Sequence, residues 1–496
     1  MSFLKERFTF LFTSTKGLVL VAIALIALTT AIWGTLSGPM AEWGVRDLSI
    51  RLLGFKLVES QREGRIIMLY HTIAMAVVAI ETYFITAALP MKQHERSTIN
   101  ATITFGYIVS LVFGLWFAYF GHNFVFHGLF LFGQSLVFFA GLLLAAALWP
   151  WKREYRVSDP AYAHTPGGVS LERLAFFAMT VATLGSALFG AVPGSYWGNG
   201  HEAFLAEDLV REPFKDALQL AIIGHLHIML TLVAVALALI VGRWFDFKGR
   251  LHKVAMPLMI AGTIVVTIGV WAVVPFETIA HFIIYAGSVL VLTAALLLVI
   301  YGLRKLTREQ LLAQGIARPN AGQRVRALLH DPVRFGALWQ MIYMNLVVTG
   351  PGLFMAARLE KVFRVWPLRE ERIILTGHWH ILSAVIATII LLYYVDMIGL
   401  RGRLRAWFAW LIVAGSDLAF AAIMVFALKR LFVNEAGQQR LVDWTILLAD
   451  MGLILVLVVL AALMLWRLVD LFRARGRWSQ ELAEARQLES TECRRP

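Results

Sequence analysis

Residues 372–381 read RIILTGHWHI, and this stretch decides the fold because two similar stretches precede it, RIIMLYHTI at 65–73 and IIGHLHI at 222–228. The first histidines of the three stretches are His71, His225 and His378, and the two intervals between them differ by one residue. Such a period indicates an internal repeat that covers the whole chain.

A second landmark recurs at the same period. The apolar segment before each stretch carries a glycine–proline pair, namely Gly38-Pro39, Pro193-Gly194 and Gly350-Pro351. The interval from Pro39 to Pro193 equals the interval from His71 to His225. Because glycine and proline are typical of helix ends, we expect a helix to end at each pair.

Between these landmarks lie apolar stretches long enough to span a bilayer, which takes about 20 residues. There are twelve, with soft edges: 17–37, 66–89, 100–120, 125–149, 171–194, 217–242, 254–275, 279–303, 337–357, 372–396, 405–428 and 444–469. The sequence therefore predicts an all-α polytopic membrane protein with twelve transmembrane helices in three pseudo-symmetric four-helix repeats. The membrane domain covers residues 1–474, with repeats at about 17–150, 171–303 and 337–470. A charged cytoplasmic tail, 475–496, is expected to lack fixed structure.

The composition agrees with a membrane location. Hydrophobic residues make up 59% of the 496, and 16% are charged, against about 25% in soluble domains. About two thirds of the 45 Lys and Arg fall on one side of the predicted spans, which predicts an inner-membrane protein with both termini cytoplasmic. The net charge of +13 is therefore attributed to topology and anionic lipid, and no nucleic-acid partner is expected. The basic outer loops 38–65 and 358–371 suit either headgroup anchoring or a partner subunit.

The single cysteine, Cys493, excludes a disulfide framework, a cysteine-ligated iron–sulfur cluster and the CxxCH attachment of c-type haem. A redox cofactor would therefore depend on other ligands. Five histidines, His71, His225, His227, His378 and His380, lie about 9–13 Å inside the predicted spans at a rise of 1.5 Å per residue. Ionisable side chains at that depth indicate a functional site, and haem iron held by imidazole is the first candidate.

These features together resemble the catalytic subunit of the haem–copper oxidase superfamily, which includes the nitric oxide reductases. Gly64-Arg65 and His71-Thr72 are similar to the start of helix two in cbb-type oxidases and nitric oxide reductases. The resemblance implies that His71 and His380 are the axial pair of a low-spin haem. It also implies that His378 is the proximal ligand of a second haem, that His225 or His227 is a metal ligand, and that Lys429-Arg430 lies near the haem propionates.

The chain departs from this family at its second metal. The predicted helix 254–275 has no histidine, position 229 is Met where oxidases have a tyrosine, and 279–303 contains no lysine. Copper or non-haem iron is therefore disfavoured. The pair His71–His380 joins the first histidine of repeat one to the second histidine of repeat three. The same rule, moved by one repeat, pairs His378 of repeat three with His227 of repeat two. Moved once more, it pairs His225 with position 73, which is Ile, so the third site is vacant. The pattern predicts two haem b groups, each held by two histidines.

Two such haems would make the chain an electron-transfer subunit of a respiratory oxidoreductase complex, working between the quinone pool and a periplasmic cytochrome or other redox subunit. No catalytic residue is assigned. The alternative is a terminal reductase of nitric oxide or dioxygen, in which His225, His227 and either His281 or Glu277 hold a non-haem metal. A transporter or assembly factor without haem is the third interpretation.

Other polar residues in the spans have both structural and functional interpretations. Glu81, Asp417 and Asp450 are candidates for proton relay or quinol binding, or for paired structural carboxylates. His122 and His127 suit either a metal or interfacial packing. Close packing or a helix end is expected of Asn345, Thr349, Gly350 and Gly352, and Trp379 is expected to lie near a haem edge.

Overall fold

The computed structural model describes residues 2–37, 43–57, 62–121, 123–197, 216–358 and 368–492, and nearly all of them are helical. The β-structure of the described residues consists of one isolated bridge, between His164 and Ser170. Ten of the described helices are long and apolar enough to cross a membrane. An all-helical, multi-pass membrane protein is thereby confirmed. Three residues or pairs discussed above, Gly38-Pro39, His122 and Cys493, lie outside the described residues.

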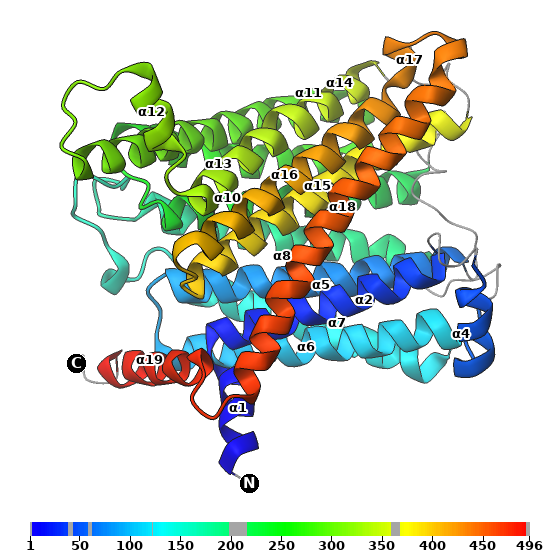
Figure 1. The fold of residues 1–496 in the computed structure, drawn as a ribbon, viewed down its shortest axis with the longest axis horizontal. Coiled ribbons are helices and arrows are strands. Elements are labelled where there is room, and N and C mark those ends of the chain that lie inside the picture. The colour runs from blue at the N-terminus through cyan, green and yellow to red at the C-terminus, as the bar shows by residue number, and fades with distance from the viewer. Residues whose placement is uncertain are drawn as a thin grey trace.

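The long helices run roughly side by side (Figure 1). They are α2 (Thr15–Ser37), α5 (Arg62–Ala88), α6 (Gln93–Phe120), α7 (Phe124–Leu148), α8 (Leu171–Trp197), α10 (Ala217–Trp244), α11 (Arg250–Ala313), α15 (Leu368–Met397), α16 (Gly402–Ala427) and α18 (Glu435–Phe472). The shorter helices are α1 (Ser2–Thr13), α4 (Val45–Leu53), η2 (Arg153–Tyr155), α12 (Ala321–Leu328), α13 (Pro332–Ile342), η3 (Tyr343–Thr349), α14 (Gly350–Arg358), α17 (Lys429–Phe432) and α19 (Arg477–Glu492).

Helix α11 contains two of the expected spans. Its backbone leaves helical geometry at Phe276 (φ −144°, ψ 55°), directly after Pro275. A Cβ on Gly269 would lie 2.9 Å from the backbone of Ile284, and a Cβ on Gly262 would lie 2.8 Å from that of Val291. The two halves of α11 therefore pack against each other as a hairpin, and glycine allows the close approach.

The expected span 337–357 is divided into α13, the π-helical η3 and α14. In η3 the hydroxyl of Thr349 donates to the carbonyl of Met344, five residues earlier (2.8 Å). The helix ends expected at Gly350-Pro351 and Pro193-Gly194 were wrong, because α14 continues to Arg358 and α8 to Trp197. Pro351 directly follows the π-helical turn, and a local change of helix type of this kind accommodates a proline, which has no N–H to donate.

The expectation of an unstructured tail was also wrong, because Arg477–Glu492 form helix α19. Trp478 and Leu482 of α19 pack on Phe10 of α1. Arg467 of α18 donates to the carboxylate of Glu481 (2.7 Å), and both side chains are buried. Burial of an aromatic ring and of an ion pair holds a segment that local composition alone would leave disordered.

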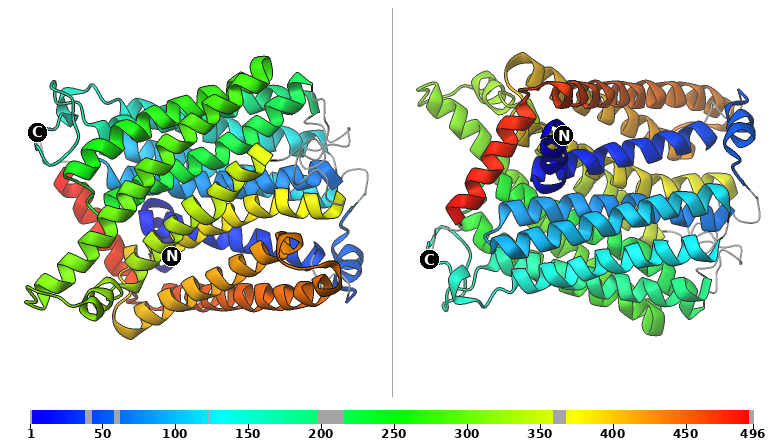
Figure 2. Two further views of the ribbon diagram at one scale, coloured as in Figure 1. Left: turned by 90° about the horizontal axis from the view of Figure 1, so that it is seen from above. Right: turned by 90° about the horizontal axis from the view of Figure 1, so that it is seen from below.

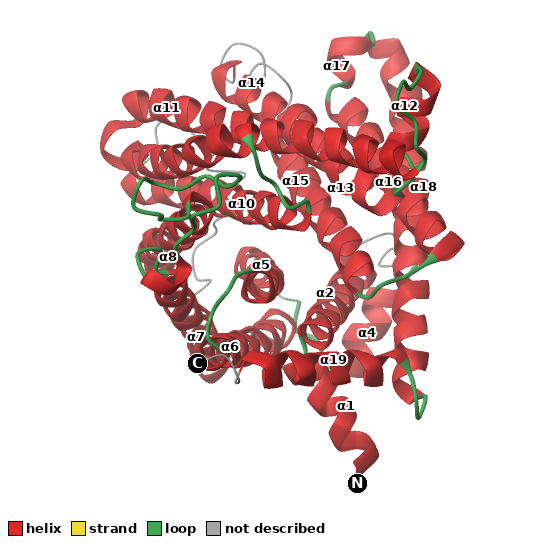
Figure 3. Cartoon of the chain, turned by 90° about the vertical axis from the view of Figure 1, so that its left-hand side faces the viewer, coloured by secondary structure: helices red, strands yellow, loops and turns green. Residues whose placement is uncertain are grey.

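Helix α5 lies inside the bundle, with α2, α6, α7, α8, α10 and α15 around it (Figure 3). Helices α5, α10 and α15 begin at the end of the bundle that carries α4 and α17, hereafter the α4 end, and run toward the end that carries α12 and α19, the α19 end (Figures 1 and 2). Their histidines follow the start of each helix by similar numbers of residues. The fold therefore brings the three histidine-bearing turns to one level near the α4 end.

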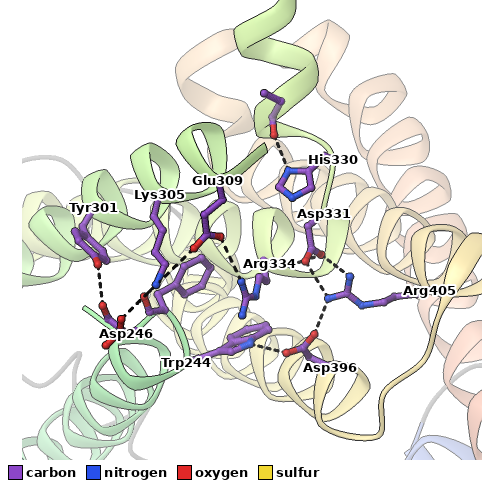
Figure 4. A network of polar contacts seen from close by, with 12 residues as sticks. Trp244, Asp246, Tyr301, Lys305, Glu309, His330, Asp331, Arg334, Asp396 and Arg405 are labelled. Atoms are coloured by element: carbon purple, nitrogen blue, oxygen red, sulfur yellow. Dashed lines mark hydrogen bonds and ion pairs between the residues drawn. The ribbon is translucent and has the colours of Figure 1, made fainter. Parts of the chain in front are cut away.

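A polar network fixes the opposite ends of the same helices (Figure 4). The guanidinium of Arg405 on α16 contacts the carboxylates of Asp331 (2.9 Å) and Asp396 (2.6 Å). The indole N–H of Trp244, at the end of α10, donates to the same Asp396 (2.7 Å). Lys305 of α11 donates to the carbonyl of Phe245 (2.8 Å). Helices α10, α11, α15 and α16 are thus connected at the α19 end.

Candidate cofactor site among the membrane histidines

Helix α5 presents two neighbouring polar rings in different directions. The Nδ1–H of His71 donates to the carbonyl of Ile67 in the preceding turn (2.8 Å), so Nε2 carries the lone pair. The preceding residue, Tyr70, shares a hydrogen bond with Nε2 of His380 on α15 (2.7 Å). Trp33 of α2 packs edge-on against the Tyr70 ring, with 5.4 Å between centroids. Consecutive helical residues point about 100° apart, so α5 presents His71 and Tyr70 to different neighbours.

A capping box fixes the residue at which helix α10 begins. Asp216 accepts from the backbone N–H of Gln219 (2.8 Å), and Gln219 accepts from that of Asp216 (2.9 Å). Two turns later, the Nδ1–H of His225 donates to the carbonyl of Ser186 on α8 (2.9 Å). Gly190 of α8 makes this possible, because a Cβ there would fall on the His225 ring. The indole N–H of Trp271 donates to the Ser186 hydroxyl (3.3 Å) and supports the same turn.

The rings of His71 and His225 are neighbours across the interface of α5 and α10. Their centroids are 6.4 Å apart, and their planes differ by 11°. Both rings keep Nδ1 bonded to a backbone carbonyl. In the described part of the chain, no hydrogen bond reaches Nε2 of either ring.

His227 points to the other side of α10, as its spacing of two residues from His225 requires. Its Nδ1–H donates to the carbonyl of Ile223 (2.7 Å). Its ring lies edge-on to Trp379 of α15, with 5.2 Å between centroids. Trp379 in turn contacts the ring of His378 at 5.6 Å. The indole of Trp379 therefore contacts both histidines that the repeat rule pairs.

His378 borders an apolar cavity of about 280 Å³ between α14, α15 and the end of α16. Gly352 of α14 approaches His378 closely, since a Cβ there would lie 3.4 Å from the ring. The remaining lining residues are Gly350, Pro351, Phe354, Met355, Gly377, Ile381, Met424, Ala427, Leu428 and Leu431. Lys429 and Arg430 follow Leu428 directly, so a basic dipeptide stands beside this cavity. Lys429 is buried, with Nζ 5.0 Å from the centroid of Phe426.

The histidine rings adjoin space inside the bundle. His227 has an exposed side chain, although its ring contacts Trp379 of the neighbouring helix α15. His71 is half-buried and lies beside the ring of His225. Both side chains therefore have protein contacts on one side and open space on another. A polar ring in that position is unfavourable in a dry apolar environment unless a bound group or water contacts it.

The structure brings the predicted site residues together in three interfaces: His71 with His225, His227 with Trp379, and His380 with Tyr70. The axial pairs His71–His380 and His227–His378 stay predictions. Tyr70, Ser186 and Gly190 were missed by sequence reasoning. Tyr70 could have been predicted, because a tyrosine next to a histidine in an apolar helix indicates a polar contact. Gly190 could not have been predicted from the local sequence, because its role depends on how α8 packs on α10.

The other candidate residues are dispersed. Glu277 and His281 are exposed at the bend of α11, and the described residues contain no cluster of three or more His, Cys, Asp or Glu side chains. Asp417 accepts from the indole of Trp339 (2.6 Å) and the amide of Gln340 (2.7 Å). Asp450 is exposed on α18, and His127 is buried beside the Phe117 ring. Asn345 donates to the carbonyl of Met341 within its own helix (2.7 Å).

Glu81 differs from these carboxylates. It is buried in α5, ten residues beyond His71, and in the described part of the chain its Oε1 has no hydrogen-bond partner. A buried carboxyl without a partner is unfavourable in an apolar environment, so Glu81 is the carboxylate of this group with a possible role beyond structure.

No protein-family model matches the chain, and no curated protein is significantly similar to it.

Proposed function

We propose that the chain is a haem-carrying membrane subunit of a respiratory oxidoreductase, which moves electrons between the quinone pool and a redox partner at the α4 end. One observation carries the proposal. Five imidazoles from α5, α10 and α15 gather at one level of a membrane bundle, at the interfaces between these helices. Histidines are rare in membrane spans because they are costly there, and imidazole is the common axial ligand of haem b.

The residues present fit such a group. Three of the rings, His71, His225 and His227, direct Nδ1–H to a backbone carbonyl, which leaves Nε2 as the metal-binding atom. The cavity beside His378 is apolar, as the face of a porphyrin requires. Lys429 and Arg430 at its edge supply positive charge for two carboxylate groups. His378, Lys429 and Arg430 would hold one haem in this arrangement.

Haem iron supplies a centre that gains and loses one electron. The protein residues around it have three separate tasks. The backbone carbonyls of Ile67, Ser186 and Ile223 fix the ring orientation of three histidines. The glycines at 190 and 352 let these rings approach the neighbouring helices. Glu81, buried below the histidine level, is placed to hold a proton that accompanies an electron.

We propose that the organisation in three four-helix repeats also holds. The hairpin of α11 and the continuous run α13–η3–α14 support this proposal, because counting the two halves of α11 and that run as separate spans gives twelve. The resemblance to the haem–copper oxidase superfamily remains part of the proposal, as does an inner membrane with both termini cytoplasmic. Both described termini lie near the α19 end (Figure 2), as that topology requires.

A terminal reductase of nitric oxide or dioxygen is the second candidate. The cavity at His378 favours it, because space beside a haem ligand is what a gas-binding centre needs. The two functions differ in coordination: an electron carrier has two axial ligands on its iron, and a gas reductase keeps one position open.

Purification of the full chain from membranes, with haem quantitation by the pyridine haemochrome method and low-temperature EPR, tests the proposal. We expect haem b with low-spin signals and no shift of the optical spectrum under carbon monoxide. A high-spin signal with a carbon monoxide complex would favour the reductase. Purified chain without haem, after supplementation of the culture with a haem precursor, would overturn both.

A further inference from the structure

The spacing of the rings of His71 and His225 leaves room for one metal ion between them. Two imidazoles joined by a direct N–H···N hydrogen bond would have centroids about 5 Å apart. Two imidazoles on opposite sides of one metal ion, with nitrogen–metal bonds of about 2.0 Å, have centroids about 6.2 Å apart. The observed separation is 6.4 Å, and the planes differ by 11°. It is too long for a direct hydrogen bond, it leaves room for one metal ion, and it is also within the range of packed aromatic rings, so the surroundings of the two rings carry the argument further.

The hydrogen bonds of the two rings agree with this spacing. Each Nδ1–H is bound to a backbone carbonyl, of Ile67 for His71 and of Ser186 for His225. The proton therefore sits on Nδ1, and the lone pair on Nε2 is available to a metal. Helix α5 directs the adjacent Tyr70 ring to His380 instead. His71 is thus aimed at α10 rather than at α15.

The position of His225 is built by its surroundings. Gly190 leaves the space that the ring fills, and Trp271 supports Ser186, whose carbonyl accepts the Nδ1 proton. Ser186 is fully buried. A histidine that only packed in the interior would not need a glycine, a carbonyl and an indole to fix one orientation. Such support from outside the first ligand shell is typical of ligating histidines.

We propose that His71 and His225 are the two axial ligands of one haem b, held between α5 and α10. This inference rests on the proposed haem function, and it replaces the His71–His380 pair that the sequence suggested. A haem at this interface joins the first and second repeats. His380, bound to Tyr70, and the pair His227 and His378 are then left for a second cofactor at α15.

The experiment compares single variants of the full-length protein purified in detergent. The variants are His71→Ala, His225→Ala and His380→Ala, with His127→Ala as the matched control, a buried histidine on α7 that packs on Phe117 of α6. Each is examined by haem quantitation and low-temperature EPR after size-exclusion chromatography has shown an intact protein. We expect the same low-spin signal to be lost in His71→Ala and in His225→Ala, and kept in the other two. Nearly parallel imidazole planes give that signal a rhombic shape.

A rescue measurement distinguishes loss of a ligand from misfolding of the variant. Imidazole added to His225→Gly fills the place of the missing ring and is expected to restore the low-spin signal. Loss of the same signal in His71→Ala and His380→Ala, with His225→Ala unchanged, would overturn the pairing and leave the haem function standing. Stoichiometric copper that both single variants lose, with unchanged haem spectra, would also overturn it. Wild-type protein without haem would overturn the proposed function and this inference together.

Discussion

Gly190 of α8 and the imidazole of His225 on α10 occupy adjoining space, and a Cβ at position 190 would fall on the ring. Replacing Gly190 with Ala must therefore move His225 or separate the two helices. Overpacking of this kind costs about 1–3 kcal/mol. We expect Gly190→Ala to weaken or shift the low-spin EPR signal assigned to His71 and His225, with little loss of total protein. Gly194→Ala is the control, because nothing lies within 4 Å of a Cβ there. Equal spectra for both variants would contradict the proposed packing role.

The hydroxyl of Tyr70 is expected to protect His380 from chemical modification. It occupies Nε2 of His380 at 2.7 Å, and Tyr70→Phe removes that single atom. Loss of one hydrogen bond lowers stability by about 0.5–1.5 kcal/mol. We expect faster reaction of His380 with diethyl pyrocarbonate in Tyr70→Phe, measured by peptide mass spectrometry. Tyr285→Phe, which alters a tyrosine stacked on His281, should leave that rate unchanged. A rate unaffected by Tyr70→Phe would show that the hydroxyl does not shield Nε2.

The ion pair of Arg467 and Glu481 fixes α19 to α18. Both side chains are almost fully buried (1% and 5% exposed), and removing Glu481 leaves the Arg467 guanidinium with the more distant carboxylate of Asp470, at 3.7 Å. Removing one partner of a buried pair destabilises by up to about 3–5 kcal/mol, and the remaining contact with Asp470 lowers that cost. We expect Glu481→Gln to lower the thermal unfolding midpoint in detergent clearly, and to expose α19 to protease.

Lys16 and Glu484 provide the matched comparison, at a distance of 3.2 Å, with Lys16 half-buried and Glu484 exposed. An exposed pair contributes about 0–1 kcal/mol, so Glu484→Gln should change the midpoint little. Similar effects of Glu481→Gln and Glu484→Gln would mean that burial does not strengthen the Arg467 pair.

Asp246, in the loop between α10 and α11, is expected to make stability depend on pH. Burial alone would raise the pKa of this carboxyl, but hydrogen bonds from Lys248 (2.5 Å) and Tyr162 (2.6 Å) outweigh burial and lower the pKa. A lowered pKa in the folded state adds stability above the unfolded pKa of about 3.9, and this stability is lost as the pH falls through the folded value. Because the side chain is 42% exposed, the contribution is at most about 1 kcal/mol.

Replacement of Asp246 by Asn tests this effect. Asn also tolerates the left-handed backbone at this position, where φ is 47°. The variant should unfold at a lower temperature than the wild type at pH 7, and the difference should shrink below about pH 4. Asp443→Asn, whose carboxylate accepts from an amide of Gln439 rather than from a cation, is the control. A difference that grows as the pH falls would reverse the sign and contradict the assignment.

Some features followed from the sequence because they depend on local pattern. Apolar length gave the spans, and the spacing of His225 and His227 gave side chains on opposite faces of α10. The neighbours of His71 and His380 did not follow, because a rotation of α5 by one residue, about 100°, exchanges Tyr70 and His71. The helix α19 could not be predicted from local sequence either, because its stability depends on the contact of Trp478 with Phe10, which is far away in the sequence.

That contact between the two ends has a consequence for biosynthesis. Arg7 donates to the carbonyls of Leu471 and Arg473, and Phe10 packs on Trp478, so α1 completes its contacts only after the segment from α18 to α19 has been made. Translation proceeds at about 5–20 residues per second, so α1 waits for tens of seconds after it is made. Spans inserted first must therefore remain in the membrane without their final partner. The contacts of α1 are complete only after α19 has been made, and a chain that stops before α19 leaves Phe10 without its contact to Trp478.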